Sequence, residues 1–185
     1  MIPLDKGLSV RVANDRDFIS VIDYFHSADA DFLLGMGVEK AKIPDKEPWL
    51  NRLYDEYRLP PERKTLFYLT WLQNGIPVGH SHINQIIFGK EAHMHLHLWN
   101  PGDRQKGNGT YFIAGSLQYY FEKFRLEKIY CQPNAANDAP NKTLEKADFT
   151  FIKKYETIPG WLNFKQHVNL WVMEKNKFQK QVNPD

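Results

Sequence analysis

A short glycine-containing segment has the composition of an anion-binding loop. Residues 104–109 read Arg-Gln-Lys-Gly-Asn-Gly, between a predicted strand that ends at Trp99 and a predicted helix that runs to about Arg125. The first N–H groups of a helix lack partners inside the helix, and the helix dipole adds positive charge there. The two glycines would let the backbone approach a phosphate closely, so the segment suits a pyrophosphate. By spacing alone, an ordinary loop leading into a helix is an equal alternative.

Five of the seven histidines alternate along two predicted strands. They are His80, His82, His93, His95 and His97. Alternate residues of a strand face the same side, and the two strands are predicted to form a hairpin, so both sets can share one sheet face. The residues between them in the second strand would then face helices on the other side. Those residues are Met94, Leu96 and Leu98.

Three interpretations of these histidines stay open. The first is a polar sheet face with hydrogen-bonded rings, which suits His80 and His82 best. The second is acid–base chemistry by His93, His95 or His97, because histidine titrates near neutral pH. The third is a metal site of the kind found in cupin barrels, since neutral imidazole is a common metal ligand. It ranks last because a single glutamate is close in sequence and helices flank the strands.

The hydrophobic pattern predicts one mixed α/β sheet that positions these residues. Strands are predicted at 8–12, 65–72, 76–88, 92–99, 128–132, 149–155 and 166–173. Helices are predicted after Asn14, at 44–63 with Pro60-Pro61 as the stop, from the end of the 104–110 loop to about Arg125, and at 137–147, with a further turn or helix fragment at 29–37. Short turns favour antiparallel pairing, whereas the strand–helix–strand unit favours a parallel pair. We expect a single domain over residues 1–175, followed by a polar tail at 176–185.

Composition excludes several classes of protein. The chain has 185 residues, of which 42% are hydrophobic and 14% aromatic, enough for one sizeable core. Its net charge of +2 argues against an obligate nucleic-acid binder. Cys131 is the single cysteine, so no intrachain disulfide can form, and we expect a buried strand residue rather than a nucleophile. Without a signal peptide or a long apolar run, we expect a cytoplasmic protein that binds no membrane.

Several motifs together resemble one protein family. Arg104-x-x-Gly107-x-Gly109 is similar to the Arg/Gln-x-x-Gly-x-Gly/Ala signature of the GNAT superfamily of acyl-CoA N-acyltransferases. Other segments resemble its branch of ribosomal-protein N-terminal acetyltransferases. They are 74–79, 99–101, Asn137-x-x-Pro140 and 144–149. The resemblance covers roughly residues 8–175. Pro140 and Asp148 depart from it, since they replace a serine and a glycine.

The resemblance implies a fold and an activity. The fold would be a mostly antiparallel sheet of about seven strands with helices on both faces, splayed between the strand ending at Trp99 and the strand at 128–132. The activity would be transfer of an acetyl group from acetyl-CoA to a primary amine, on a protein N-terminus or a small molecule, by direct attack in a ternary complex. The alternatives are a cupin-like metal-binding protein and a non-catalytic coenzyme A-binding domain. A homodimer is compatible with the sequence.

The resemblance also assigns roles to residues, and no metal is expected among them. The coenzyme A contacts would be His97, Trp99, Arg104, Gln105, Lys106, Gly107, Asn108, Gly109, Thr110 and Asn137. A backbone N–H of His97 or Trp99 would polarise the thioester carbonyl. The candidate proton acceptors are His93, His95 and His97. Leu144 stands where many members have a tyrosine acid, and it cannot protonate the leaving thiolate. By analogy Trp49 and Tyr54 could line the acceptor cleft, although ordinary helix packing is an equal alternative.

Overall fold

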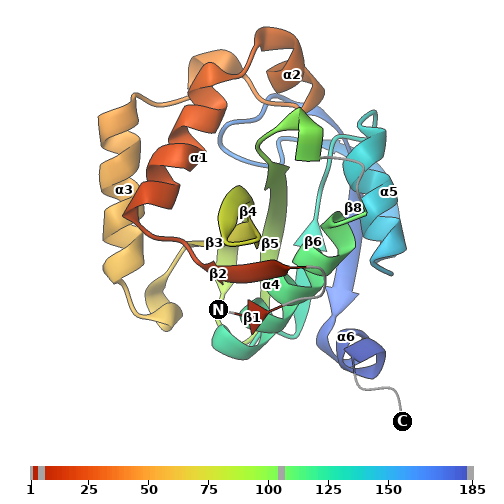
Figure 1. Ribbon diagram of the computed structural model, residues 1–185. Coiled ribbons are helices and arrows are strands. Elements are labelled where there is room, and N and C mark those ends of the chain that lie inside the picture. The colour runs from red at the N-terminus through yellow and green to blue at the C-terminus, as the bar shows by residue number, and fades with distance from the viewer. Residues whose placement is uncertain (1, 4–6, 104–106, 183–185) are drawn as a thin grey trace.

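A single open sheet organises the chain. The computed structural model describes residues 2–3, 7–103 and 107–182, and its strands follow the order β1-β2-β3-β4-β5-β6-β8-β7 (Figure 1). The strands are β1 (Ile2–Pro3), β2 (Leu8–Val12), β3 (Leu66–Gln73), β4 (Ile76–Ile87), β5 (Glu91–Leu98), β6 (Lys128–Cys131), β7 (Thr150–Thr157) and β8 (Gln166–Glu174). Seven of them match the predicted strands, and the two-residue β1 was not predicted. The sheet does not close on itself, so it is not a cupin barrel.

Helices cover both faces of the sheet. They are α1 (Asp15–Ser27), α2 (Ala30–Gly35), α3 (Lys46–Arg58), α4 (Gly109–Lys123), α5 (Asp138–Lys146) and α6 (Lys175–Val182), with short 3-10 turns η1 (Lys40–Lys42), η2 (Pro61–Arg63) and η3 (Pro101–Asp103). Asn14 starts α1 through a capping box with Asp17, as its residue type predicts. The helix predicted at 44–63, with Pro60-Pro61 as its stop, ends at Arg58, just before those prolines. Leu59 is extended there, because the residue before a proline is disfavoured in the α region.

Two hydrophobic clusters hold these layers together. One cluster joins α1 and α3 to one face of β3 through residues such as Phe18, Leu53 and Tyr68. The other joins α4 to the opposite face through residues such as Leu69 and Ile113. Figure 1 shows α1 and α3 lying side by side at one edge of the molecule. Each face of the sheet therefore has its own core.

The C-terminal segment differs from the prediction. Residues 175–182 form helix α6 rather than a polar tail. Phe178 is only 7% exposed and packs against Phe121 of α4. One apolar side chain at helical spacing from polar neighbours is enough to dock this helix. None of the helices in the described part of the chain is long and apolar enough to cross a membrane.

The sheet opens between β5 and β6, as predicted. These two strands are parallel and share only three residue pairs, from Glu91–Lys128 to His93–Tyr130. β5 then continues to Leu98, whereas β6 ends at Cys131. Helix α4 provides the crossover that a parallel pair requires. The result is a wedge between two strands in the middle of the sheet.

Candidate active site

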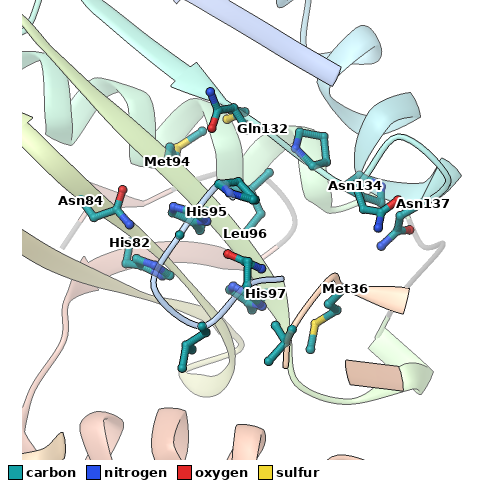
Figure 2. A pocket seen from close by; sticks show the side chains of 18 of the residues that line it. Met36, His82, Asn84, Met94, His95, Leu96, His97, Gln132, Asn134 and Asn137 are labelled. Atoms are coloured by element: carbon teal, nitrogen blue, oxygen red, sulfur yellow. The ribbon is translucent and has the colours of Figure 1, made fainter. Parts of the chain in front are cut away.

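A pocket occupies the opening between β5 and β6. It is lined from one face of the sheet by side chains near α1 and α2, and from the other face by α5 and the segment after β6 (Figure 2). Its lining residues are Phe25, Met36, Val38, His82, Asn84, Met94, His95, Leu96, His97, Cys131, Gln132, Pro133, Asn134, Asn137, Pro140, Leu144, Pro159, Gly160, Trp161, Leu162, Asn163 and Gln166. Segments far apart in sequence meet here, so a ligand in the opening would touch both sides of the sheet.

The histidines stack across the β4–β5 hairpin, as their alternation predicts. His80 pairs with His97, and His82 pairs with His95. The ring centroids lie 4.7 Å apart in the first pair and 4.5 Å apart in the second. His93 follows on the same strand face, but it packs against Tyr130 and does not line the pocket. Of the three predicted proton acceptors, the structure therefore brings His95 and His97 into the pocket.

Burial keeps most of these rings neutral. It lowers the pKa of His80 and of His82 well below the ordinary value of 6.5, with neighbouring histidines adding to the effect. Burial also lowers the pKa of His95 to about 4 and lowers the pKa of His93. An imidazole in a low-dielectric site loses its charged form first. At neutral pH these rings offer hydrogen bonds rather than positive charge.

Several buried polar atoms on this face have no protein partner among the described residues. Four of them are Nε2 of His80, Nδ1 of His82, Nε2 of His95 and Oδ1 of Asn84, and a fifth is Oγ1 of Thr70, which lies opposite His80 on β3. Buried polar groups are usually satisfied, so each exception needs a reason. Three of these five residues line the pocket. The simplest reason is that a ligand supplies the missing hydrogen bonds.

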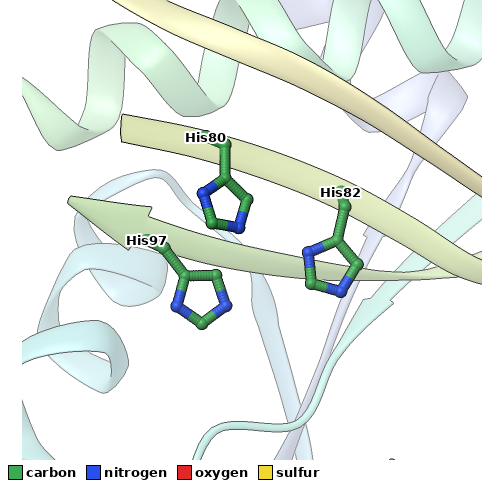
Figure 3. Close-up of side chains that lie close together, drawn as sticks. All are labelled: His80, His82 and His97. Carbon is green, nitrogen blue, oxygen red and sulfur yellow. The ribbon is translucent and has the colours of Figure 1, made fainter. Parts of the chain in front are cut away.

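Three of the rings also form a triangle that resembles a metal site. His80, His82 and His97 each offer a nitrogen atom within 4.8 Å of the others, and Figure 3 shows the rings turned toward one another. However, the indole nitrogen of Trp99 donates to Nδ1 of His80 at 2.8 Å. The neutral ring then carries its proton on Nε2, so that atom cannot ligate a metal. A ligating histidine normally donates from its second nitrogen, and His80 accepts there. This chemistry disfavours the metal interpretation.

The predicted anion-binding loop lies at the carboxyl end of β5. Residues 104–106, which include the predicted contacts Arg104, Gln105 and Lys106, lie outside the described residues. Gly107 has φ +75°, which favours glycine, and a Cβ there would meet nothing within 4 Å. Helix α4 begins at Gly109, so Gly109 and Thr110 contribute first-turn N–H groups that have no acceptor inside the helix. Asn108 precedes them as the N-cap residue and is buried.

The second glycine of the loop also has a packing role that the sequence did not predict. A Cβ on Gly109 would lie 3.0 Å from Cγ2 of Thr143 in α5. Gly109 therefore allows the start of α4 to approach α5 closely. This contact comes from tertiary packing, and the local sequence gave no sign of it.

The backbone donor predicted for the thioester carbonyl is wrong for Trp99. Its N–H donates to the carbonyl oxygen of Val78 at 3.0 Å, so it points to β4 and away from the opening. Direction alternates along a strand, so the N–H of His97 also points to β4, and the N–H of Leu96 points to the opening. Leu96 lies beyond the last residue pair with β6 and lines the pocket. Trp99 itself packs with the α1–α3 cluster.

The remaining predicted residues divide between the pocket and the core. Asn137 lines the pocket and begins α5, and its side chain donates to the carbonyl oxygen of Gly35 at 3.4 Å. Leu144 lines the pocket too and offers no acid. Trp49 and Tyr54 do not line it and serve helix packing instead. Cys131 is buried, as predicted.

Sequence reasoning missed several residues on the α1–α2 side of the pocket. Met36 follows α2, and Trp161 and Leu162 lie in the segment between β7 and β8. Trp161 is 42% exposed, although its ring packs edge-on against Trp49 at 5.7 Å. The only signal in the sequence for this part of the pocket was a tryptophan that follows a Pro-Gly pair between two predicted strands.

Comparisons with known proteins agree with this geometry. No family model and no curated protein sequence matches the chain. Among solved structures, the ribosomal L7/L12 alpha-N-protein acetyltransferase RimL, in complex with coenzyme A, is similar over 95% of this chain and 98% of its own, with 14% identity and a TM-score of 0.75. The chain has the GNAT fold.

Two further solved structures share this GNAT fold. The Vibrio cholerae spermidine N-acetyltransferase, in complex with coenzyme A and spermine, is 16% identical with a TM-score of 0.75, and the match covers 95% of this chain and 99% of that one. The aminoglycoside acetyltransferase AAC(6')-Ib, in complex with coenzyme A and kanamycin, is 15% identical with a TM-score of 0.72, over 95% and 99% of the two chains. The likeness therefore extends over nearly the whole length of each protein.

Proposed function

We propose that the chain transfers an acetyl group from acetyl-CoA to a primary amine by direct attack in a ternary complex. The observation that carries this proposal is the opening at the carboxyl ends of the parallel strands β5 and β6, the end of the sheet at which the chain passes from β5 to the start of α4. The three solved structures named above are N-acetyltransferases with coenzyme A in their complexes. The arm that carries the thioester can pair with an open strand edge, and the pyrophosphate can bind at the N-terminus of a helix.

Coenzyme A would enter from the α4–α5 side. Its pyrophosphate would accept hydrogen bonds from the first-turn amides at Gly109 and Thr110, with Gly107 leaving room for close approach. Its pantetheine arm would run along β5 beyond His93, where β6 no longer pairs. Asn137, at the wall of the opening, would donate to or accept from that arm.

The amine would enter from the α1–α2 side and meet the thioester inside the opening. Its nitrogen lone pair attacks the carbonyl carbon, and the new C–N bond gives a tetrahedral intermediate. The N–H of Leu96 stabilises the oxyanion, since it is the backbone donor that faces the opening. The C–S bond then breaks, the thiolate leaves and takes a proton from water, and the amine nitrogen loses its extra proton to the protein.

The histidines would have two roles toward the amine, accepting its proton and holding it by hydrogen bonds. His97 lines the pocket at the end of β5, and we assign it the proton of the attacking amine. His82 and His95 are neutral rings with unpartnered nitrogen atoms, so they would hold the amine by hydrogen bonds. The pKa of His95, lowered to about 4 by burial, makes it a weak base. His93 lies outside the pocket and has no direct role.

Calorimetry with acetyl-CoA tests the first half of this proposal. The wild-type chain should bind acetyl-CoA in the micromolar range, and Gly107→Glu should weaken binding by at least about tenfold, because a carboxylate would face the pyrophosphate. Gly75→Glu is the matched control. Gly75 also has a positive φ, +79°, and open space around its Cβ, but it lies in the turn between β3 and β4. Absence of wild-type binding, or equal losses in both variants, would contradict the proposal.

A further inference from the structure

The pocket carries no formal charge of its own. None of its described lining residues is an aspartate, a glutamate, a lysine or an arginine. Its polar groups are amides and histidines, and burial holds the pKa of His82 and of His95 well below the ordinary range. A second ammonium group on an acceptor would thus lose water in this pocket without meeting a carboxylate, which is unfavourable.

Two cationic side chains, Arg52 and Lys42, contact residues of the pocket wall. The guanidinium carbon of Arg52 lies 5.2 Å from the ring centroid of Trp161. The ammonium of Lys42 donates to the carbonyl oxygen of Asn163 at 2.8 Å. The nearby carboxylate of Glu39 is already paired with Lys42 at 2.7 Å. The Lys42–Glu39 pair has no net charge, so Arg52 supplies the net charge beside this wall, and it would repel a polycation rather than attract it.

The acceptor side of the pocket is apolar. Phe25, Met36, Val38, Trp161 and Leu162 form this wall. Two more large apolar residues are exposed beside it in the chain, Leu34 at 60% and Ile158 at 57%. An apolar wall that is partly exposed, as at Trp161, is typical of a binding surface. The chemistry of this surface fits a hydrocarbon or aromatic body.

We propose that the acceptor carries a single amine on an apolar body, with the amine at the histidines and the body against Trp161, Leu162 and Met36. Polyamines and aminoglycosides would be poor acceptors. This inference rests on the proposed acetyl transfer, and it sets the chain apart from the neighbours whose structures hold spermine and kanamycin. A small amine and a peptide N-terminus with an apolar first side chain share this chemistry.

A matched pair of amines tests the inference. Hexylamine and hexane-1,6-diamine have the same chain length, but the second amine of the diamine stays protonated near pH 7.5, since alkylamines resemble lysine with a pKa of about 10.4. Release of coenzyme A thiol, measured at saturating acetyl-CoA, should give kcat/KM at least about tenfold higher for hexylamine. Equal or higher kcat/KM for the diamine would overturn the inference while leaving acetyl transfer intact. No release with either amine, with spermidine or kanamycin, or with a peptide that begins with leucine would contradict acetyl transfer itself.

A charge placed in the pocket should change this preference. Met36→Glu adds a carboxylate to the acceptor wall, and Met36→Gln is the neutral control of the same length. The ratio of kcat/KM for the diamine to that for hexylamine should rise at least about fivefold in Met36→Glu relative to Met36→Gln, because the carboxylate would pair with the second ammonium. This ratio does not depend on the fraction of folded enzyme. Equal ratios in the two variants would overturn the inference.

Peptides distinguish the two sources of such an amine. One peptide begins with leucine and the other with lysine, and their remaining residues are the same. A leucine peptide that outperforms hexylamine would identify a protein N-terminus as the source, and the reverse order would identify a small molecule. A lysine peptide that outperforms the leucine peptide would overturn the inference.

Discussion

The two faces of strand β4 bury polar groups in opposite ways. On the α4 face, the hydroxyl of Ser81 bonds to Ser116 and to Tyr120, each at 2.9 Å, and the indole of Trp71 donates to Ser116 at 2.9 Å. On the other face, the next residue, His82, keeps Nδ1 without a protein partner among the described residues. Both faces are buried, and only one of them is satisfied.

The difference separates polar groups that build the fold from polar groups that await a ligand. A satisfied buried network makes the packing of α4 on the sheet specific. An unsatisfied buried group destabilises the protein, by about 1–3 kcal/mol for each lost partner, and is tolerated where function requires it. The histidine face lines the opening between β5 and β6, whereas the Ser81 network does not. The predictions below test this division.

The largest expected effect is on catalysis at the histidine face. Replacing His97 in His97→Gln removes the assigned proton acceptor, and kcat/KM should fall by about 10²–10⁴-fold. His93→Gln is the matched control, because His93 lies on the same strand face but outside the pocket. It should keep kcat/KM within about threefold of wild type. Activity is measured by thiol release. Equal losses of kcat/KM in His97→Gln and His93→Gln would contradict a catalytic role that is confined to the histidines of the pocket.

The next effect is on stability as a function of pH. Burial lowers the pKa of His95 to about 4, below the ordinary 6.5, so the unfolded chain takes up the proton first as the pH falls. The contribution of His95 is therefore complete above pH 6.5 and is lost as the pH falls from 6.5 toward 4. The loss amounts to about 3 kcal/mol at most, at about 1.4 kcal/mol per pH unit.

Urea unfolding at pH 7 and pH 5 measures this loss. The free energy of unfolding should fall less between the two pH values in His95→Gln than in wild type. His167→Gln is the control, because His167 is an exposed histidine on β8. It should keep the wild-type pH dependence. If His95→Gln also kept that dependence, the histidine face would not be a buried neutral cluster.

A smaller effect is expected on the satisfied face. Ser116→Ala removes the group that joins Ser81 to Trp71, and the free energy of unfolding should fall by about 2 kcal/mol. Per folded molecule, kcat/KM should stay unchanged. The control Ser20→Ala removes a serine hydroxyl on α1 that bonds only to the preceding turn, and it should change stability by less than about 0.5 kcal/mol. A large catalytic loss in Ser116→Ala would contradict the division between the faces.

Local patterns predicted the frame of this molecule well. The alternation of histidines and apolar residues in β5 predicted which side chains lie on each face of the strand, because a strand has a period of two. Asn14, as a residue type that caps helices, gave the start of α1. The strand–helix–strand unit gave the parallel pair of β5 and β6, whereas the opening between them was predicted from the family resemblance. Each of these signals depends on residues that are close together in the chain, so a single sequence is enough to detect it.

The sequence could not supply what depends on register and on distant contacts. The hydrogen-bonding register between β5 and β4 decides which amides of β5 face the opening. The prediction selected residues 97 and 99, whose N–H groups point to β4 instead. Met36 and Trp161 reach the pocket from segments more than a hundred residues apart. The unsatisfied ring nitrogens become visible only once every neighbour is placed. Helix α6 was missed because one buried phenylalanine in a polar segment is a weak signal.

A crystal structure of the chain with coenzyme A would test the central claim most directly. The account predicts the pyrophosphate at the first turn of α4 and the sulfur atom in the wedge between the two parallel strands, within reach of the N–H of Leu96 and the ring of His97. A cofactor bound elsewhere, or a wedge filled by the protein's own side chains, would contradict it.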